Sequence, residues 1–159
     1  MVKIIVIHGI MGGGKSTITS ELIKKLPDYV LVDKAYIKDT MLKKVKKDDA
    51  DFARKLSRDA TYMIAKELIA KGYNLILQET RAPSVKKYLG EDNEIKSFYL
   101  HCSLETAKKR DLERQNRHVR PEIVEEMYNK HGYADEEDIS INTEQKSIYE
   151  TVDFILEKI

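Results

Sequence analysis

The chain has 159 residues, within the ~100–200 residues usual for one domain, so we expect a single compact domain over 1–159. With 28 Lys and Arg against 27 Asp and Glu, the net charge of +1 argues neither for nor against a nucleic-acid partner. The only cysteine, Cys102, excludes an internal disulfide and a multi-cysteine metal site and fits a reducing compartment. No apolar run has the length of a signal-peptide core or a membrane span, which predicts a soluble cytoplasmic protein without a membrane partner.

The first predicted element is a strand over residues 2–8, a nearly continuous apolar run typical of a parallel strand that is covered on both faces. A helix follows and runs to about Leu26, where Pro27 stops it. Between them, residues 9–17 read GIMGGGKST, which fills the pattern G-x-x-x-x-G-K-[ST] without a gap. This strand–loop–helix context predicts a phosphate-binding loop.

The spacing of this loop has a physical reason. Its consecutive glycines permit positive φ angles and close backbone approach, which curve N–H groups around a di- or triphosphate at a helix N-terminus. The lysine is expected to bridge the β- and γ-phosphates and the serine hydroxyl to ligate Mg²⁺. The alternative, a plain glycine-rich turn, needs neither side chain. The predicted nucleotide-binding residues of the loop are Gly9, Gly12, Gly13, Gly14, Lys15, Ser16 and Thr17.

Strands and helices alternate along the rest of the chain. Further strands are predicted over residues 29–32, 73–77, 95–101 and 139–141. Residues 34–51 are charged and are expected to be irregular, and Pro83 is expected to break the chain. Helices are predicted over 52–68, from the N-cap Ser103 into a basic stretch, over 121–131, and after a Ser147–Glu150 capping box.

The alternation predicts an α/β fold with right-handed crossovers and a parallel sheet. Ligands of open parallel sheets bind outside the carboxyl ends of the strands. The polar residues expected at those ends, besides the loop, are His8, Asp33, Glu79, Arg81 and His101.

Two carboxylates at these strand ends are candidates for chemistry. Asp33 is placed to orient an acceptor hydroxyl and take its proton, although an aspartate there can equally cap the following helical turn. Glu79 stands where phosphate-loop proteins often carry the acidic residue that holds Mg²⁺ directly or through water. A solvated salt bridge is the alternative for Glu79.

Cations supply the remaining candidates. Arg110, Arg114 and Arg117 are expected on one face of a continuous helix, as a flap over the nucleotide or as a solvated basic helix end. The lysine run in residues 43–47 could attract a polyanion or simply be solvated surface, because neighbouring aspartates dilute its field. The four histidines show no metal-ligand spacing and receive no catalytic role: His8, His101, His118 and His131.

The motif GIMGGGKST, the aspartate after the second strand and the segment KRDLERQNRHVRPEIVEEM at 109–127 together resemble the small P-loop kinases of the nucleoside-monophosphate-kinase type. The narrower resemblance is to the kinase domain of phage-type polynucleotide 5′-kinases. It implies a three-layer α/β/α fold with strand order 2-3-1-4-5, a helical lid at about 110–121, and ATP and Mg²⁺ as cofactors. It also implies Asp33 as general base and Arg114 as the lid arginine acting on the donor phosphates, with Arg110 beside it.

Two departures from the narrower family concern the acceptor. Tyr36 stands where those kinases usually carry an arginine, and Lys34 and Lys38 flank it. The third strand ends in Glu79-Thr80-Arg81 in place of an aspartate-threonine-asparagine stretch. The acceptor-binding set is therefore predicted as Asp33, Lys34, Lys38, Glu79 and Arg81, and the metal set as Ser16 and Glu79.

The leading hypothesis is an ATP- and Mg²⁺-dependent kinase that phosphorylates a hydroxyl, with the 5′-hydroxyl of a nucleic acid as the first candidate acceptor. A nucleoside, a nucleoside monophosphate or another small metabolite is the alternative acceptor. A nucleotide-binding switch without catalysis is the third hypothesis, which the arginine-rich segment and the absence of an N-K-x-D sequence disfavour.

Overall fold

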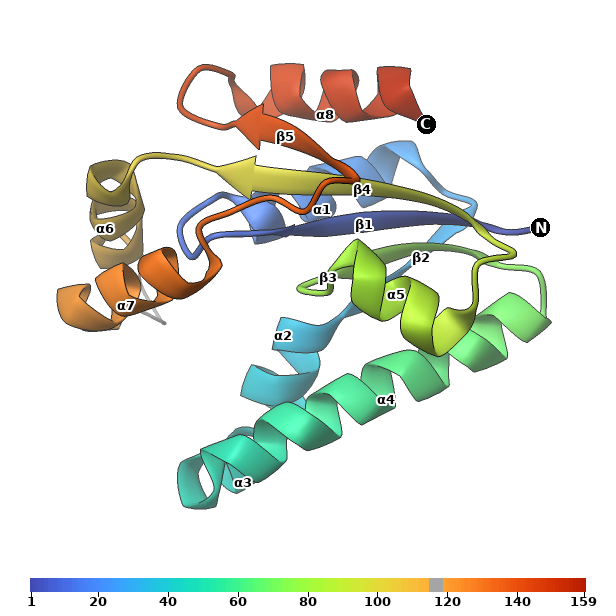
Figure 1. Ribbon diagram of the computed structural model, residues 1–159, viewed down its shortest axis with the longest axis horizontal. Coiled ribbons are helices and arrows are strands. Elements are labelled where there is room, and N and C mark those ends of the chain that lie inside the picture. The colour runs from blue at the N-terminus through green and yellow to red at the C-terminus, as the bar shows by residue number, and fades with distance from the viewer. Residues whose placement is uncertain (115–118) are drawn as a thin grey trace.

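Five parallel strands form one sheet in the order β2-β3-β1-β4-β5 in the computed structural model, which describes residues 1–114 and 119–159 (Figure 1). The predicted strand order and the all-parallel pairing are confirmed. Each strand agrees with its predicted range to within about a residue. The strands are β1 (Lys3–Gly9), β2 (Tyr29–Asp33), β3 (Asn74–Gln78), β4 (Glu94–His101) and β5 (Asp138–Asn142).

Helices cover both faces of the sheet and complete the predicted three layers (Figure 1). One face carries α1 (Lys15–Lys25) and α8 (Ile148–Lys158), and the other carries α4 (Ala50–Ala70) and α5 (Ala82–Leu89). The remaining helices, which lie at the carboxyl ends of the strands, are α2 (Lys34–Tyr36), the π-helical turn η1 (Ile37–Met41), α3 (Lys43–Asp48), α6 (Leu104–Leu112) and α7 (Pro121–His131). Among the described residues, no helix is long and apolar enough to cross a membrane.

The core is divided by the sheet, because successive side chains of a strand point to opposite faces. Ile5 and Ile7 of β1 pack in a cluster with residues of α1 and α8, whereas Ile4 and Val6 pack with residues of α4 and α5. All four side chains are almost fully buried. The apolar run of β1 therefore places the loop that follows it on a rigid central strand.

Two local predictions were wrong. Residues 34–51 are not irregular: the Asp33 carboxylate caps α2 and the Asp49 carboxylate caps α4, so a charged stretch forms short helices. Pro83 does not break the chain but lies in the first turn of α5, where its missing N–H has no helical partner to lose.

The predicted continuous helix through the lid arginines was also wrong. α6 ends at Leu112, and the Val119 N–H donates to the buried Asp111 carboxylate at 2.7 Å. Arg110 is therefore helical, whereas Arg114 lies beyond the helix end. Arg117 and the predicted lid positions 115–118 lie outside the described residues.

Candidate active site

The loop at residues 9–17 joins β1 to α1, as predicted. Gly14 is the N-cap of α1 and has φ 88°, and Gly12 has φ 79°. Gly13 does not share the predicted positive φ; its role is close approach, because a Cβ there would lie 2.7 Å from the Leu100 carbonyl oxygen. The first helical N–H groups of α1 thus open onto a loop that only glycines can form.

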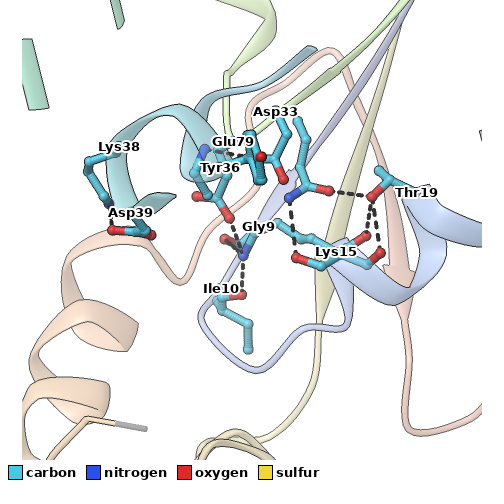
Figure 2. A network of polar contacts seen from close by, with 12 residues as sticks. Gly9, Ile10, Lys15, Thr19, Asp33, Tyr36, Lys38, Asp39 and Glu79 are labelled. Carbon is cyan, nitrogen blue, oxygen red and sulfur yellow. Dashed lines mark hydrogen bonds and ion pairs between the residues drawn. The ribbon is translucent and has the colours of Figure 1, made fainter. Parts of the chain in front are cut away.

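Lys15 is buried within this loop (Figure 2). Its ammonium donates to the carbonyl oxygens of Ile10 at 2.8 Å and Gly9 at 3.2 Å, and lies 3.2 Å from a Glu79 carboxylate oxygen. The positive charge is thereby held beside the strand ends. Ser16 and Thr17 follow it in the first turn of α1, where both are exposed.

Glu79 reaches Lys15 because of an unusual backbone. Its φ of 67° is the only positive φ of a non-glycine residue among those described, and it turns the chain while the Glu79 N–H still donates to the Ile7 carbonyl oxygen. Burial raises the pKa of Glu79, but Lys15, Lys34 and Lys38 outweigh burial and hold it below its usual value. Glu79 is therefore an ionised partner of the loop lysine.

The residue that contacts Ser16 is Gln78, which sequence reasoning did not assign to the site. Its amide nitrogen donates to the Ser16 hydroxyl at 3.3 Å, and its amide oxygen accepts from Thr19. Gln78 is 1% exposed and ends β3. The available signal was the amide that follows the apolar residues Leu75–Leu77, one residue before Glu79.

Asp33 ends β2, in register with Gln78 of the neighbouring strand. One carboxylate oxygen accepts from the backbone N–H groups of Ala35 at 2.7 Å and Tyr36 at 3.1 Å. The capping role weighed for Asp33 is therefore present. A cap uses one oxygen of the carboxylate as acceptor, so capping and proton acceptance are compatible in one side chain.

A cavity of about 960 Å³ opens beside the loop and the end of β3. Thr80 lines it with a hydroxyl that is buried and has no hydrogen-bond partner among the described residues. A buried polar atom without a partner favours a ligand that supplies one. Other lining residues come from the loop (Lys15, Ser16), from β3 and its end (Glu79, Arg81) and from α6 and α7 (Asp111, Met127).

The wall of this cavity formed by α2, η1, α3 and α4 is cationic. Three carboxylates pair with its cations: Asp39 with Lys46, Asp51 with Arg54, and Asp59 with Lys55. Cations still outnumber carboxylates, so the wall keeps a positive charge. Its cations, which we call the cationic wall, are Lys34, Lys38, Lys46, Arg54, Lys55 and Arg58.

The pKa of Lys34 reflects the burial of this residue and the cations that surround it. Burial lowers its pKa most, and the neighbouring cations Lys38, Lys15 and Arg58 lower it further, although Glu79 acts in the opposite direction. A site whose ammonium groups disfavour one another's charge gains stability when an anion binds among them. The predicted acceptor residues Lys34 and Lys38 thus lie together in the cavity.

Arg81 also lines the cavity but is already paired. It donates from Nε to the Asp135 carboxylate at 2.7 Å and forms a second bond to it from an amino nitrogen, and its guanidinium lies over the Tyr133 ring at 5.2 Å. Asp135 holds the pKa of Arg81 above its usual value. Arg81 therefore lies at the site with its guanidinium already paired with the Asp135 carboxylate.

The two predicted nucleotide-binding arginines lie differently. Arg110 donates to the Gly12 carbonyl oxygen at 3.1 Å and to the hydroxyl and carbonyl oxygens of Thr143 at 2.8 and 3.0 Å. It braces the loop against the chain that follows β5. Arg114 lines the cavity, 3.5 Å from an Asp111 carboxylate oxygen, and is the arginine that faces the site.

A second polar cluster lies beside the cavity. His8 Nε2 lies 2.8 Å from the Asp138 carboxylate, which also accepts from Ser97 at 2.5 Å, and Asp135 is near enough for the three residues to share a metal ion. Each carboxylate already has protein partners, so the cluster is a satisfied network. Sequence spacing gave no sign of it, because His8 and Asp138 are 130 positions apart.

The fold and this site together define a P-loop protein with a kinase-like fold. A family model described as an AAA domain matches residues 5–140, so the chain belongs to that family. Comparison with curated proteins finds no match.

Solved structures share the fold over nearly the whole chain. A sugar kinase from Janibacter sp. HTCC2649 is 12% identical with a TM-score of 0.76, covering 99% of this chain and 94% of that one. A gluconokinase from Sinorhizobium meliloti 1021 is 14% identical with a TM-score of 0.67, covering 96% and 89%. A chain of the Pnkp1/Rnl/Hen1 RNA repair complex is 16% identical with a TM-score of 0.65, covering 81% of this chain and 43% of that one.

Proposed function

We propose that this protein is an ATP- and Mg²⁺-dependent kinase that transfers the γ-phosphate to a hydroxyl group, with the 5′-hydroxyl of a nucleic acid as acceptor. The observation that carries the proposal is the shared cavity: the phosphate loop with Lys15 and the cationic wall line the same space. A donor phosphate and an anionic acceptor can therefore meet there. We propose further that residues 1–159 act as one kinase domain in the cytoplasm.

The residues beside the loop fit a magnesium ion. Mg²⁺ prefers oxygen ligands and takes only one or two from the protein in nucleotide sites. Ser16 offers a hydroxyl at the start of α1, and Glu79 offers an ionised carboxylate in the same cavity. When bound, the ion would neutralise charge on the transferring phosphates.

Residues of the protein itself have the other roles in binding the substrates and transferring the phosphate. The loop amides and Lys15 hold the donor phosphates, and Arg114 approaches them from the lid. Asp33 orients the acceptor hydroxyl and accepts its proton as the bond to phosphorus forms. Thr80 supplies a hydrogen bond to the bound acceptor, since its hydroxyl has no partner within the described chain.

The cationic wall favours a nucleic-acid acceptor over an uncharged one. A sugar or nucleoside has no anionic group for the positive charge that remains on this wall after three carboxylates pair with its six cations, whereas a 5′ end has phosphates next to it. Tyr36, Met41 and Phe52 are exposed on the same elements and offer surfaces on which bases can stack. Lys34, Lys38 and Arg58 would contact the phosphates closest to the reacting hydroxyl.

A nucleoside, a nucleoside monophosphate or another small metabolite is the second candidate acceptor. The cavity volume of about 960 Å³ suits a ligand of that size, and two structural neighbours are a sugar kinase and a gluconokinase. Labelled ATP with Mg²⁺, offered with 5′-hydroxyl DNA, 5′-hydroxyl RNA, nucleosides, nucleoside monophosphates and sugars, separates the two. Transfer to a small molecule but to no oligonucleotide would replace the first proposal with the second.

Removing two cations of the wall tests the acceptor directly. The double variant Arg54→Gln/Arg58→Gln is expected to raise KM for a 5′-hydroxyl oligonucleotide by about tenfold or more, because each lost phosphate contact weakens binding. The dependence of KM on salt should become shallower at the same time. Steady-state kinetics at several salt concentrations measure both.

Lys44→Gln is the matched control for this variant, because Lys44 lies on α3 with a side chain that is 90% exposed and does not line the cavity. It should leave KM unchanged. Equal effects of Lys44→Gln and the double variant would show that only general surface charge matters. An unchanged KM in the double variant would remove the wall from the acceptor site.

A further inference from the structure

Gln78, and not the predicted Glu79, contacts the loop serine that a carboxylate assists in other phosphate-loop proteins. In those proteins an aspartate at the end of the neighbouring strand acts with the loop Ser or Thr to hold the metal. Here the contact to Ser16 comes from the end of β3, and the group that makes it is neutral. Glu79, one residue later, pairs with Lys15 instead.

The hydrogen bonds of the Thr19 hydroxyl limit the orientations that the Gln78 amide can adopt. Its single proton has three oxygen atoms in reach: the Lys15 carbonyl at 3.0 Å, the Ser16 carbonyl at 3.3 Å, and the Gln78 amide oxygen. Only one of them can receive it fully. With the amide oxygen facing Thr19, the amide nitrogen faces Ser16 and occupies a lone pair of its hydroxyl oxygen.

Rotating the amide by half a turn exchanges its oxygen and nitrogen without moving other atoms. The nitrogen then donates to the Thr19 hydroxyl, whose proton goes to the Lys15 carbonyl. The amide oxygen accepts the proton of Ser16, and both lone pairs of the Ser16 oxygen become available to a cation. Every polar atom of the trio has a partner in this arrangement.

We propose that Gln78 is the positioning residue for Mg²⁺: its rotated amide accepts the Ser16 proton and aims the Ser16 oxygen at the ion, in the place of a carboxylate. This inference rests on the proposed function, because it assumes that the loop binds a nucleotide with Mg²⁺. Since the amide is neutral, the site has one negative charge fewer beside the ion. Metal binding therefore depends more on the nucleotide phosphates, and we expect a high Mg²⁺ requirement.

Two substitutions of Gln78 test this through binding alone. Gln78→Leu keeps the volume and removes both hydrogen bonds; it should raise the Mg²⁺ concentration for half-maximal binding of a fluorescent ATP analogue about tenfold or more. Gln78→Glu keeps an acceptor for Ser16 and adds charge; it should lower that concentration by about tenfold. Titrations with Mg²⁺ and with Mn²⁺, and a parallel titration of the analogue in EDTA, give these values.

The two substitutions should shift metal dependence in opposite directions, which a merely structural role cannot do. Thr61→Val is the control for loss of a buried hydroxyl, because Thr61 lies on α4, is not among the residues that line the cavity, and donates within its own helix. It should leave the Mg²⁺ requirement unchanged. Circular dichroism and thermal melting report the fold of each variant.

The outcomes separate this inference from the proposed function. A wild-type protein that binds the analogue, with neither variant shifting the Mg²⁺ requirement, overturns the role of Gln78 and leaves the kinase proposal standing. Parallel losses of metal-free binding, metal-dependent binding and melting temperature in both variants also overturn it. A folded wild-type protein that binds no nucleotide contradicts both. If Gln78→Leu does not fold, Gln78→Glu alone decides.

Discussion

Replacing Lys15 with alanine is expected to slow phosphoryl transfer by ~100-fold or more, the usual effect of removing one charged donor from a preorganised phosphate site. The physical reason is that Lys15 is buried beside the loop carbonyls, where its charge is screened little by solvent. Single-turnover transfer from labelled ATP measures the loss. Because the ammonium also pairs with Glu79, the variant leaves an unpaired carboxylate, so a melting curve must accompany the kinetics.

Lys24→Ala is the matched control, since Lys24 lies on the same helix, has a side chain that is 63% exposed, and forms a surface ion pair with Glu21. It should transfer phosphate at the wild-type rate. Lys15→Met tests the same charge with a side chain of similar length and should behave as the alanine variant does. Near-normal transfer by folded Lys15→Ala and Lys15→Met proteins would show that the loop is not the donor site.

Replacing Asp33 with asparagine is expected to reduce turnover by about 10²–10⁴-fold, the range for loss of a general base. Asparagine is as good an N-cap as aspartate, so the bonds from Ala35 and Tyr36 that begin α2 should persist. The substitution therefore separates the observed capping role of Asp33 from its proposed role as general base. Pre-steady-state transfer at saturating ATP and acceptor measures the chemical step.

Asp49→Asn provides the control, because Asp49 caps α4 in the same way but is exposed at the start of a helix and does not end a strand of the sheet. It should keep the wild-type rate. If Asp33→Asn also keeps the wild-type rate, Asp33 is a cap only and the base assignment is wrong. If Asp33→Asn and Asp33→Ala differ in melting temperature but not in rate, the carboxylate contributes to the fold through α2 alone.

Much of the fold could be predicted from the apolar runs and from the glycine, proline and capping residues that separate them. The β1 strand is apolar on both faces because helices cover both faces of the sheet. This continuous apolar pattern is typical of a buried parallel strand, so the strand could be predicted from it. The capping box at Ser147 and Glu150 forms as predicted, since it depends only on residues three apart. Local rules succeed where local bonds decide the structure.

The failures share a different cause. Residues 34–51 are rich in charge, and charge content says little about helix formation once caps such as Asp33 and Asp49 are in place. The helix at Arg110 ends at Leu112, and Asp111 near its end accepts a hydrogen bond from Val119, a contact that spacing alone does not reveal. Neither wrong prediction affects the predicted order of the strands in the sheet.

The positions of the candidate site residues could be predicted where a sequence motif defines them. They could not be predicted where they depend on contacts between distant parts of the chain. The position of the loop between β1 and α1, and the positions of Asp33 and Glu79 at strand ends, were predicted from the sequence alone. The bracing role of Arg110 depends on Thr143, and the contact of Gln78 depends on Thr19 and Ser16. Such partners meet only after the sheet has formed, so a linear pattern does not disclose them.

The left-handed backbone at Glu79 has a consequence for how this chain can change. A non-glycine residue in that conformation costs about 1–3 kcal/mol, which glycine would avoid. Selection for heat tolerance and selection for chemistry therefore pull this position in opposite directions. Homologues that have lost catalysis should drift toward glycine or asparagine here, whereas active ones should retain an acid despite the conformational penalty.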